Sequence, residues 1–354
     1  MVAADLPVLD VTRGGIVESS HFGAIAVVDS QGQLQAWYGD AHQVTFLRSS
    51  AKPIQLLPFI QAGGDRHFQL TPAEISVMCG SHDGSQAHVQ VVEGIQSRVG
   101  ITETDLLCGI QPPLDESVAF GLIAQGKDPT PNQHNCSGKH TGMLAYARML
   151  SFALNDYTEM EHPVQQAILT CMAEMCNLPR SQVVVGRDGC SVPTFGMPLF
   201  NAALAYARLC DPQDLPPERA DACRKITRAM LAHPENVAGP KRFDTRLMMM
   251  TGQRMICKGG AEGFLAIGLL PGALGSGSPG IGIAIKISDG DAKNRARPAV
   301  ALELLRQIDA LSTGEVSALA EFGPVLPVTN WRRFVVGESH PVFKVITSGW
   351  KPHG

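Results

Sequence analysis

The sequence predicts an α/β protein of the α+β type, with a mixed, largely antiparallel sheet packed between helices. Two β-type runs, residues 23–28 and 33–38, flank the tetrapeptide Asp-Ser-Gln-Gly, whose composition suits a hairpin turn. Farther along, helical and strand patterns alternate, and glycines and prolines separate them without any internal repeat. A hairpin followed by alternating elements favours a mixed sheet over a purely parallel one.

The later elements follow from hydrophobic periodicity and from the residues that begin and end helices. A helix over residues 72–79 is the best marked, because Thr71, Pro72 and Glu74 form a capping-box start and Gly80 offers a stop. The other expected helices cover residues 53–62, 85–99, 141–152, 163–177 and 295–311. Apolar runs bounded by glycines predict strands at residues 182–186, 264–270 and 282–287.

Composition predicts an ordinary globular protein. The 354 residues are 44% hydrophobic and 18% charged, which suits one compact domain over residues 1–354, and no apolar run is long enough to cross a bilayer. The segment from Met1 to Asp10 lacks the pattern of a secretory signal, so we expect a cytoplasmic location and no membrane partner.

Cysteine content and charge narrow the function classes. The nine cysteines are odd in number and lack regular pairing, which argues against a disulfide framework and favours core packing or metal binding. A net charge of −4 with scattered Lys and Arg argues against a nucleic-acid partner.

Ser49 and Lys52 are the first candidates for chemistry. They stand three residues apart where a helix should begin, because Pro53 is tolerated in a first helical turn. A serine hydroxyl needs a neighbouring base, and a lysine serves when desolvation or positive charge keeps it neutral. The spacing alone is weak, since a capping serine beside a solvated lysine explains it equally well.

Two clusters could build a metal site. Residues 135–142 bring a thiol, an amine and an imidazole into one turn before a helix, and residues 186–191 place a second thiol after a predicted strand. Thiolate and imidazole are ordinary zinc ligands, so chemistry alone selects Cys136, Cys190 and either His134 or His140. Buried packing of both cysteines is the competing interpretation.

Two glycine-rich segments complete the candidate site. In residues 258–263, Lys258 precedes glycines that let a backbone approach a ligand, and the lysine could face a substrate carboxylate or a second serine. Residues 80–84 similarly form either a bare turn or a second serine site at Ser81.

Taken together, these segments resemble the zinc-dependent L-asparaginases of the rhizobial type (class 3), a family distantly similar to serine β-lactamases and serine-dependent glutaminases. The resemblance runs in the family's order through nearly the whole chain. Its segments are residues 13–19, 39–40, 48–53, 79–84, 135–142, 186–190, 233–234 and 258–263.

The resemblance implies hydrolysis of L-asparagine to L-aspartate and ammonia in a homodimer, with Ser49 and Lys52 as one catalytic pair and Ser81 and Lys258 as a second. It implies a zinc ion held by Cys136, Lys139 and Cys190. The third ligand is then the amine of Lys139 and not a histidine imidazole. Substrate-binding roles fall to Arg48, His82, Asp83, His140, Asp188, Gly259 and Gly260.

Two other functions remain compatible with the same residues. A penicillin-recognising, β-lactamase-like acyl hydrolase would share Ser49 and Lys52 without needing the cysteines. A non-catalytic amino-acid sensor would use the same pocket for binding alone.

Overall fold

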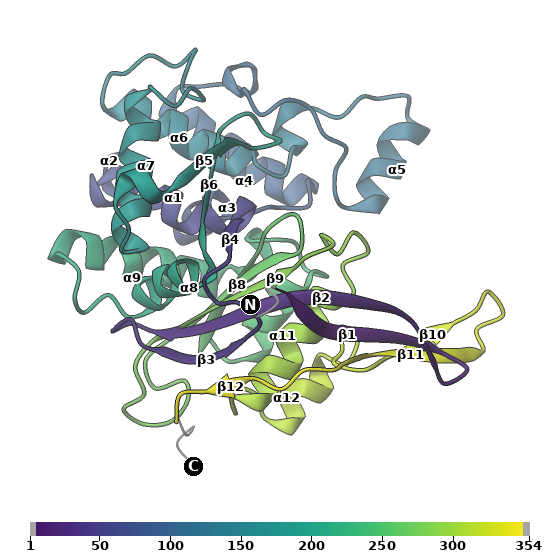
Figure 1. Cartoon of the computed structure of the whole chain (residues 1–354). Helices are drawn as coiled ribbons and strands as arrows, with labels where there is room; N and C mark the ends of the chain where they lie inside the picture. The colour runs from purple at the N-terminus through teal and green to yellow at the C-terminus, as the bar shows by residue number, and fades with distance from the viewer. Residues whose placement is uncertain (1–4, 350–354) are drawn as a thin grey trace. The chain divides into compact units, whose positions relative to one another are not determined.

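A computed structural model describes residues 5–349, and these divide into two compact units (Figure 1). Among the described residues, the sheet unit comprises 5–48, 197–211 and 246–349, and the helical unit comprises 49–196 and 212–245. The first four residues of the Met1 to Asp10 segment lie outside the described part. The single domain over residues 1–354 stays a prediction, because compactness alone does not decide whether the units fold together. Over residues 5–349, no helix combines the length and the apolar character needed to span a membrane.

The sheet unit is built on a nine-stranded sheet in which every pairing is antiparallel. The main path runs β10-β11-β1-β2-β9-β8-β7, and β3 pairs with β2 and β12. Its strands are β1 (Leu6–Arg13), β2 (Ile16–Asp29), β3 (Leu34–Tyr38), β7 (Met255–Gly259), β8 (Phe264–Leu269), β9 (Ile281–Ile287), β10 (Leu326–Thr329), β11 (Val335–Pro341) and β12 (Ile346–Thr347). The short strand β4 (Val44–Phe46) lies outside this sheet.

The predicted hairpin is confirmed, with Ile25 opposite Tyr38 and Val27 opposite Ala36. Strand β2 also pairs with β1 and with β9, so it lies in the interior of the sheet.

Small residues let a helix approach this sheet closely. Helix α8 (Leu199–Cys210) packs on β2, β8 and β9. A Cβ added to Gly282 would lie 1.8 Å from the carbonyl oxygen of Ala203, so only glycine fits there. Alternate residues of a strand face opposite sides, and the isoleucines of β9 therefore face away from α8, toward α11 (Ala296–Gln307). The sheet lies between helices, as predicted, and the short helix α12 (Thr313–Ala318) follows α11.

The helical unit gathers helices around α1 (Lys52–Gln61), which packs against α7, α9 and α6. Residues 52–60 of α1 are all buried. The other helices are α2 (Gly64–His67), α3 (Pro72–Met78), α4 (Gln86–Val99), α5 (Glu116–Ala124), α6 (Ser137–Met149), α7 (Pro163–Met175) and α9 (Pro217–Ala232), and the strands β5 (Val184–Arg187) and β6 (Pro193–Pro198) pair antiparallel. Helix α10 (Phe243–Met250) contains the boundary between the two units.

The predicted helices agree with these bounds at most ends. The capping box at Thr71 and Glu74 is confirmed, with both of its hydrogen bonds present. Helix α6 is the main difference, because it begins at Ser137 and not at residue 141. A Cβ on Gly138 would lie 2.4 Å from the carbonyl oxygen of Val77, so close packing on α3 accounts for a glycine in the first turn.

Candidate active site

Lys52 is the centre of the polar arrangement in the helical unit. It begins α1 directly after the 3-10 turn Arg48–Ala51, and its side chain is 1% exposed. Its Nζ atom makes three hydrogen bonds, to the carbonyl oxygen of Gly80 at 2.6 Å, to Ser81 Oγ at 2.9 Å and to the carbonyl oxygen of Asn135 at 3.3 Å. Burial lowers the pKa of this amine overall. The negative charge and hydrogen bond of Cys136 oppose this shift, whereas the charge of Lys139 acts in the same direction as burial.

The geometry around Lys52 assigns a direction to each hydrogen bond. Carbonyl oxygens only accept, so a neutral amine would donate its two hydrogens to Gly80 and Asn135. The nitrogen lone pair would then face Ser81 Oγ and could take its proton. The structure therefore brings Lys52 together with Ser81, while Ser49 lies half-buried in the 3-10 turn. The pairing of Ser49 with Lys52 stays a prediction.

Ser81 is held by its backbone. It follows the end of α3, is 6% exposed, and its N–H donates to the carbonyl oxygen of Val237 at 2.7 Å. Gly80 must be glycine here, because a Cβ would lie 2.4 Å from the carbonyl oxygen of Asn236. Close contact between these two loops thus fixes the serine next to Lys52.

The three predicted zinc ligands come together in the same unit. The Nζ atom of Lys139 donates to Cys190 Sγ at 2.9 Å, and both cysteine thiols are buried. The hydrogen bond from Cys190 and the charges of Lys52 and Lys139 hold the pKa of Cys136 well below its usual value, whereas that hydrogen bond and burial raise the pKa of Cys190. Burial lowers the pKa of Lys139, but the two neighbouring sulfurs outweigh it and raise the pKa overall.

This donor set fits a zinc ion only if the lysine takes part. Among residues 5–349 no group of three or more His, Cys, Asp or Glu side chains is arranged to hold a metal. Two thiols and one amine give three donors, which leaves a fourth tetrahedral position open for a ligand. Within the described residues neither His134 nor His140 joins Cys136 and Cys190 in a three-residue metal group, and the imidazole set that chemistry alone selected stays a prediction.

The donor cluster and the lysine–serine pair are neighbours. Lys52 and Lys139 both line an internal cavity of about 10 Å³, which offers room for about one water molecule. Asp188, half-buried in the loop before Cys190, adds its negative charge to the surroundings of Lys139. The two predicted functions, acyl transfer and metal binding, thus share one region of the helical unit.

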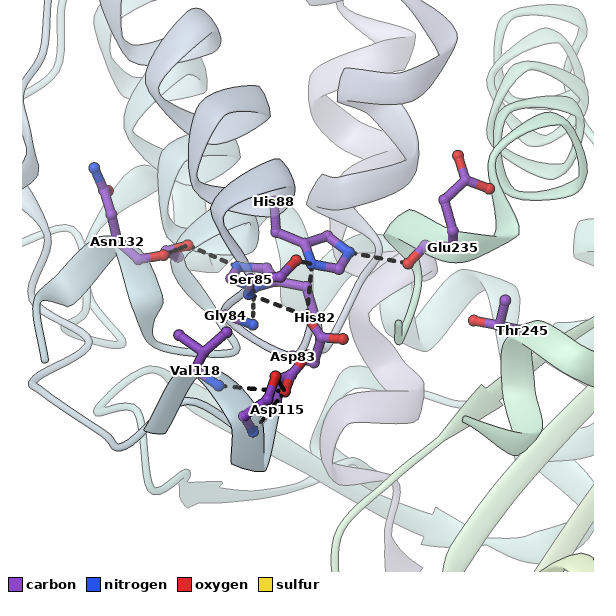
Figure 2. A network of polar contacts seen from close by, with 12 residues as sticks. His82, Asp83, Gly84, Ser85, His88, Asp115, Val118, Asn132, Glu235 and Thr245 are labelled. Atoms are coloured by element: carbon purple, nitrogen blue, oxygen red, sulfur yellow. Dashed lines mark hydrogen bonds and ion pairs between the residues drawn. The ribbon is translucent and has the colours of Figure 1, made fainter. Parts of the chain in front are cut away.

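His82 and Asp83 continue the Ser81 loop into a network with His88 of α4 (Figure 2). Both ring nitrogens of His88 face oxygen atoms, with Nδ1 2.8 Å from Asp83 Oδ1 and Nε2 2.9 Å from the carbonyl oxygen of Glu235. Burial raises the pKa of Asp83, but the hydrogen bond and charge of His88 outweigh burial and lower it. Asp83 therefore remains a carboxylate at the wall of a cavity of about 430 Å³, which Lys241 and Arg242 also line.

His82 itself is completely buried and neutral. Its Nδ1 accepts from the N–H of Gly84 at 3.2 Å, so its proton is on Nε2, 2.8 Å from Ser137 Oγ. Burial, helped by the charges of His88 and Lys52, lowers the pKa of His82 from 6.5 to about 3. The ring thus ties the Ser81 loop to the first turn of α6 rather than facing open space.

His140 lies one helical turn after Cys136 and is also completely buried. Its Nδ1 is 2.6 Å from the hydroxyl of Tyr157, and burial holds its pKa well below the usual value. Tyr157 and His88 are the residues that sequence reasoning missed. Neither belongs to a motif, and only their three-dimensional contacts reveal them.

The remaining predicted residues belong to the sheet unit. Lys258 is 1% exposed in β7, and its Nζ donates to the carbonyl oxygen of Gly259 at 2.6 Å. Gly260 accepts from Arg297 and donates to the carbonyl oxygen of Phe264 at 2.8 Å. Arg48 has a φ of +50°, a strained value for a non-glycine residue, directly before Ser49. The pairing of Ser81 with Lys258 stays a prediction.

Comparison with known proteins decides the family. The L-asparaginase II family matches residues 9–341, nearly the whole chain. The chain belongs to the L-asparaginase II family. Membership makes it an amidohydrolase of the asparaginase or glutaminase type, which binds a small-molecule substrate.

Solved structures with a similar fold are serine-dependent glutaminases and a β-lactamase. A Bacillus glutaminase crystallised in 4.3 M NaCl is 12% identical and covers 81% of this chain and 91% of its own, with a TM-score of 0.41. A probable glutaminase from Bacillus subtilis complexed with 6-diazo-5-oxo-L-norleucine is 13% identical and covers 83% and 86%, with a TM-score of 0.38. A β-lactamase from Mycobacterium bovis is 12% identical and covers 80% and 94%, with a TM-score of 0.39. The predicted fold class is confirmed. No curated protein matches the sequence.

Proposed function

We propose that this amidohydrolase is an L-asparaginase that works through a serine–lysine acyl-enzyme. The observation that carries the proposal is the buried Lys52 amine, whose three hydrogen bonds leave its lone pair directed at a serine hydroxyl when it is neutral. Family membership supplies the reaction class, and the resemblance of the motifs supplies asparagine as the substrate.

In the proposed reaction Ser49 attacks the side-chain amide carbon of L-asparagine while its proton passes to Lys52, with Ser81 as the hydroxyl that carries it. The C–N bond then breaks, Lys52 returns the proton to the nitrogen, and ammonia leaves. Water then attacks the β-aspartyl ester and Lys52 again accepts a proton. As the ester C–O bond breaks, Lys52 passes this proton to the Ser49 oxygen, and L-aspartate and free Ser49 are released. Attack by Ser81 itself is the rival assignment, supported by its 2.9 Å contact with Lys52.

Oxyanion stabilisation is proposed to come from backbone N–H groups. Ser49 lies in the 3-10 turn that leads into α1, and the backbone N–H groups near the start of a helix carry partial positive charge. Removal of one oxyanion donor typically costs about 10²- to 10³-fold in kcat, so this turn is part of the catalyst.

Zinc held by Cys136, Lys139 and Cys190 would supply a positive centre for the α-amino and α-carboxylate groups of the substrate. We propose this binding role because thiolate ligands reduce Lewis acidity. The motif resemblance also leads us to propose a homodimer, which sedimentation equilibrium would test.

Replacing either zinc-binding cysteine by serine should raise KM for L-asparagine by about tenfold or more while kcat falls less than KM rises. The reason is that zinc is proposed to bind substrate and not to activate water. Steady-state ammonia release and zinc content per chain measure both effects for Cys136→Ser and Cys190→Ser. Cys171→Ser, at another buried cysteine of the same unit, is the matched control. A fall in kcat that is larger, as a fold-change, than the rise in KM would contradict a binding role for zinc.

The test of the proposed function is ammonia release from L-asparagine by the purified protein, with and without added zinc, beside Ser49→Ala. Release that Ser49→Ala abolishes supports the proposal. Release from L-glutamine alone would overturn the asparagine assignment. Hydrolysis of nitrocefin without ammonia release would favour a β-lactamase-like hydrolase, and stoichiometric asparagine binding without release would favour a sensor.

A further inference from the structure

His140 carries a buried polar atom without a partner. Its ring is 0% exposed, and Nε2 has no hydrogen-bond partner anywhere in residues 5–349. Nearly all buried polar atoms in proteins are hydrogen-bonded, so an orphan of this kind requires an explanation. Cys136 precedes Lys139 by three residues and His140 by four, and residues three or four apart share a helix face. The orphan atom therefore belongs to the helix turn that carries two of the proposed zinc ligands.

The hydroxyl of Tyr157 determines which nitrogen of this ring holds the proton. The backbone N–H of Leu107 donates to Tyr157 Oη at 2.8 Å, and Oη lies 2.6 Å from His140 Nδ1. If Nδ1 carried the proton, Oη would accept twice, and the phenolic hydrogen would be left without an acceptor in a site that is 0% exposed. With Nδ1 as the acceptor, all three groups are satisfied. The proton of the neutral ring is then on Nε2.

We propose that Tyr157 is a positioning residue, which holds His140 as the Nε2–H tautomer and so presents that N–H to a carboxylate oxygen of the amino-acid substrate. A carboxylate suits this place because the N-terminus of α6 and the amine of Lys139 both favour negative charge. The identity of the acceptor rests on the proposed function, whereas the tautomer rests on the Leu107, Tyr157 and His140 contacts alone.

The tautomer is measurable without any activity. In protein labelled with ¹⁵N-histidine, ring correlation spectra distinguish a proton-bearing nitrogen from an acceptor nitrogen, and His140→Gln identifies the signals by their loss. We expect Nδ1 of His140 to be the acceptor in the unmodified protein. Tyr157→Phe removes the hydroxyl that fixes the tautomer. The ¹⁵N chemical shifts of the two ring nitrogens should then move toward averaged values.

Kinetics test the substrate contact. Tyr157→Phe should raise KM for L-asparagine by about two- to tenfold, the equivalent of one neutral hydrogen bond, and change kcat by less than about twofold. The amide nitrogen of glutamine offers a donor near the position of Nε2, so His140→Gln should retain most of the binding. Adding Tyr157→Phe to His140→Gln should then have no further effect on KM. Tyr146→Phe, at a half-buried tyrosine of the same helix, should leave both KM and the tautomer unchanged.

The outcomes separate the two parts of the proposal. A proton on Nδ1 of His140 in the unmodified protein, or a tautomer unchanged in Tyr157→Phe, overturns the positioning role. A shifted tautomer with unchanged KM overturns the contact with substrate. If Tyr157→Phe does not fold, the spectrum of the unmodified protein still decides the tautomer. His140→Leu, which removes the donor, then decides the contact, because an unchanged KM in that variant overturns it. Failure of the unmodified protein to release ammonia would overturn the proposed function and not the tautomer.

Discussion

Lys52→Met is expected to lower kcat for L-asparagine by about 10³- to 10⁴-fold, with KM changed by less than about threefold. Methionine fills nearly the same volume but cannot accept a proton from Ser81 or return one to the leaving nitrogen, and general-base catalysis contributes about this much. Ammonia release over a range of substrate concentrations measures both constants. A variant that retains more than about a tenth of the original kcat would exclude Lys52 as the base.

Two controls make this result specific. Lys127→Met, at an exposed lysine after α5, should behave like the unmodified protein. Circular dichroism should show that Lys52→Met is folded, since the substitution also leaves the carbonyl oxygens of Gly80 and Asn135 without their donor. Peptide mass spectrometry of a rapidly quenched reaction then locates the acyl group. An adduct on Ser81 would make Ser81 the nucleophile in place of Ser49.

Acidification from pH 7 to pH 5 is expected to lower the free energy of unfolding by about 2 kcal/mol through His82 alone. Burial, with the charges of His88 and Lys52, lowers the pKa of His82 in the folded protein to about 3, from 6.5 for an unperturbed histidine. A lowered pKa means that the unfolded chain binds the proton first, so this contribution is fully present above pH 6.5 and is lost as the pH falls toward 3. At pH 5 the difference spans about 1.5 pH units at 1.36 kcal/mol each.

Denaturant unfolding at pH 7 and pH 5 measures this loss. His82→Asn keeps an acceptor near the N–H of Gly84, but asparagine does not titrate. Between pH 7 and pH 5 the free energy of unfolding of this variant should therefore fall by about 2 kcal/mol less than that of the unmodified protein. His42→Asn, at an exposed histidine of the sheet unit, is the matched control and should keep the full loss. Equal pH dependence in His82→Asn and the unmodified protein would show that His82 is not held neutral.

Local sequence signals predicted much of the fold. The capping box at Thr71 and the β2–β3 hairpin were readable because their determinants lie within a few residues of one another. Several elements were not predicted, namely helices α2, α5, α8, α9, α10 and α12 and strands β1, β4, β6, β7, β10, β11 and β12. The close approach of α8 to β9 depends on Gly282, whose role is invisible until Ala203 is placed beside it.

The candidate site shows the same limit. Ser49 and Lys52 attracted notice through their spacing, but the hydroxyl bonded to Lys52 comes from Ser81, 29 positions later in the chain. Two carbonyl groups complete that contact, and backbone atoms leave no signature in residue type. Tyr157 illustrates this most clearly, because its hydroxyl acquires a role only through contacts with Leu107 and His140.

The burial of α1 has a consequence for the motions of the enzyme. Residues 52–60 are enclosed by α6, α7 and α9, so the backbone amides of this helix should exchange with deuterium only when the helical unit unfolds as a whole. Lys52 therefore sits on one of the slowest-exchanging segments of the chain. Lys52 should therefore keep its position when substrate binds, and any change of conformation should occur in the loops around the site.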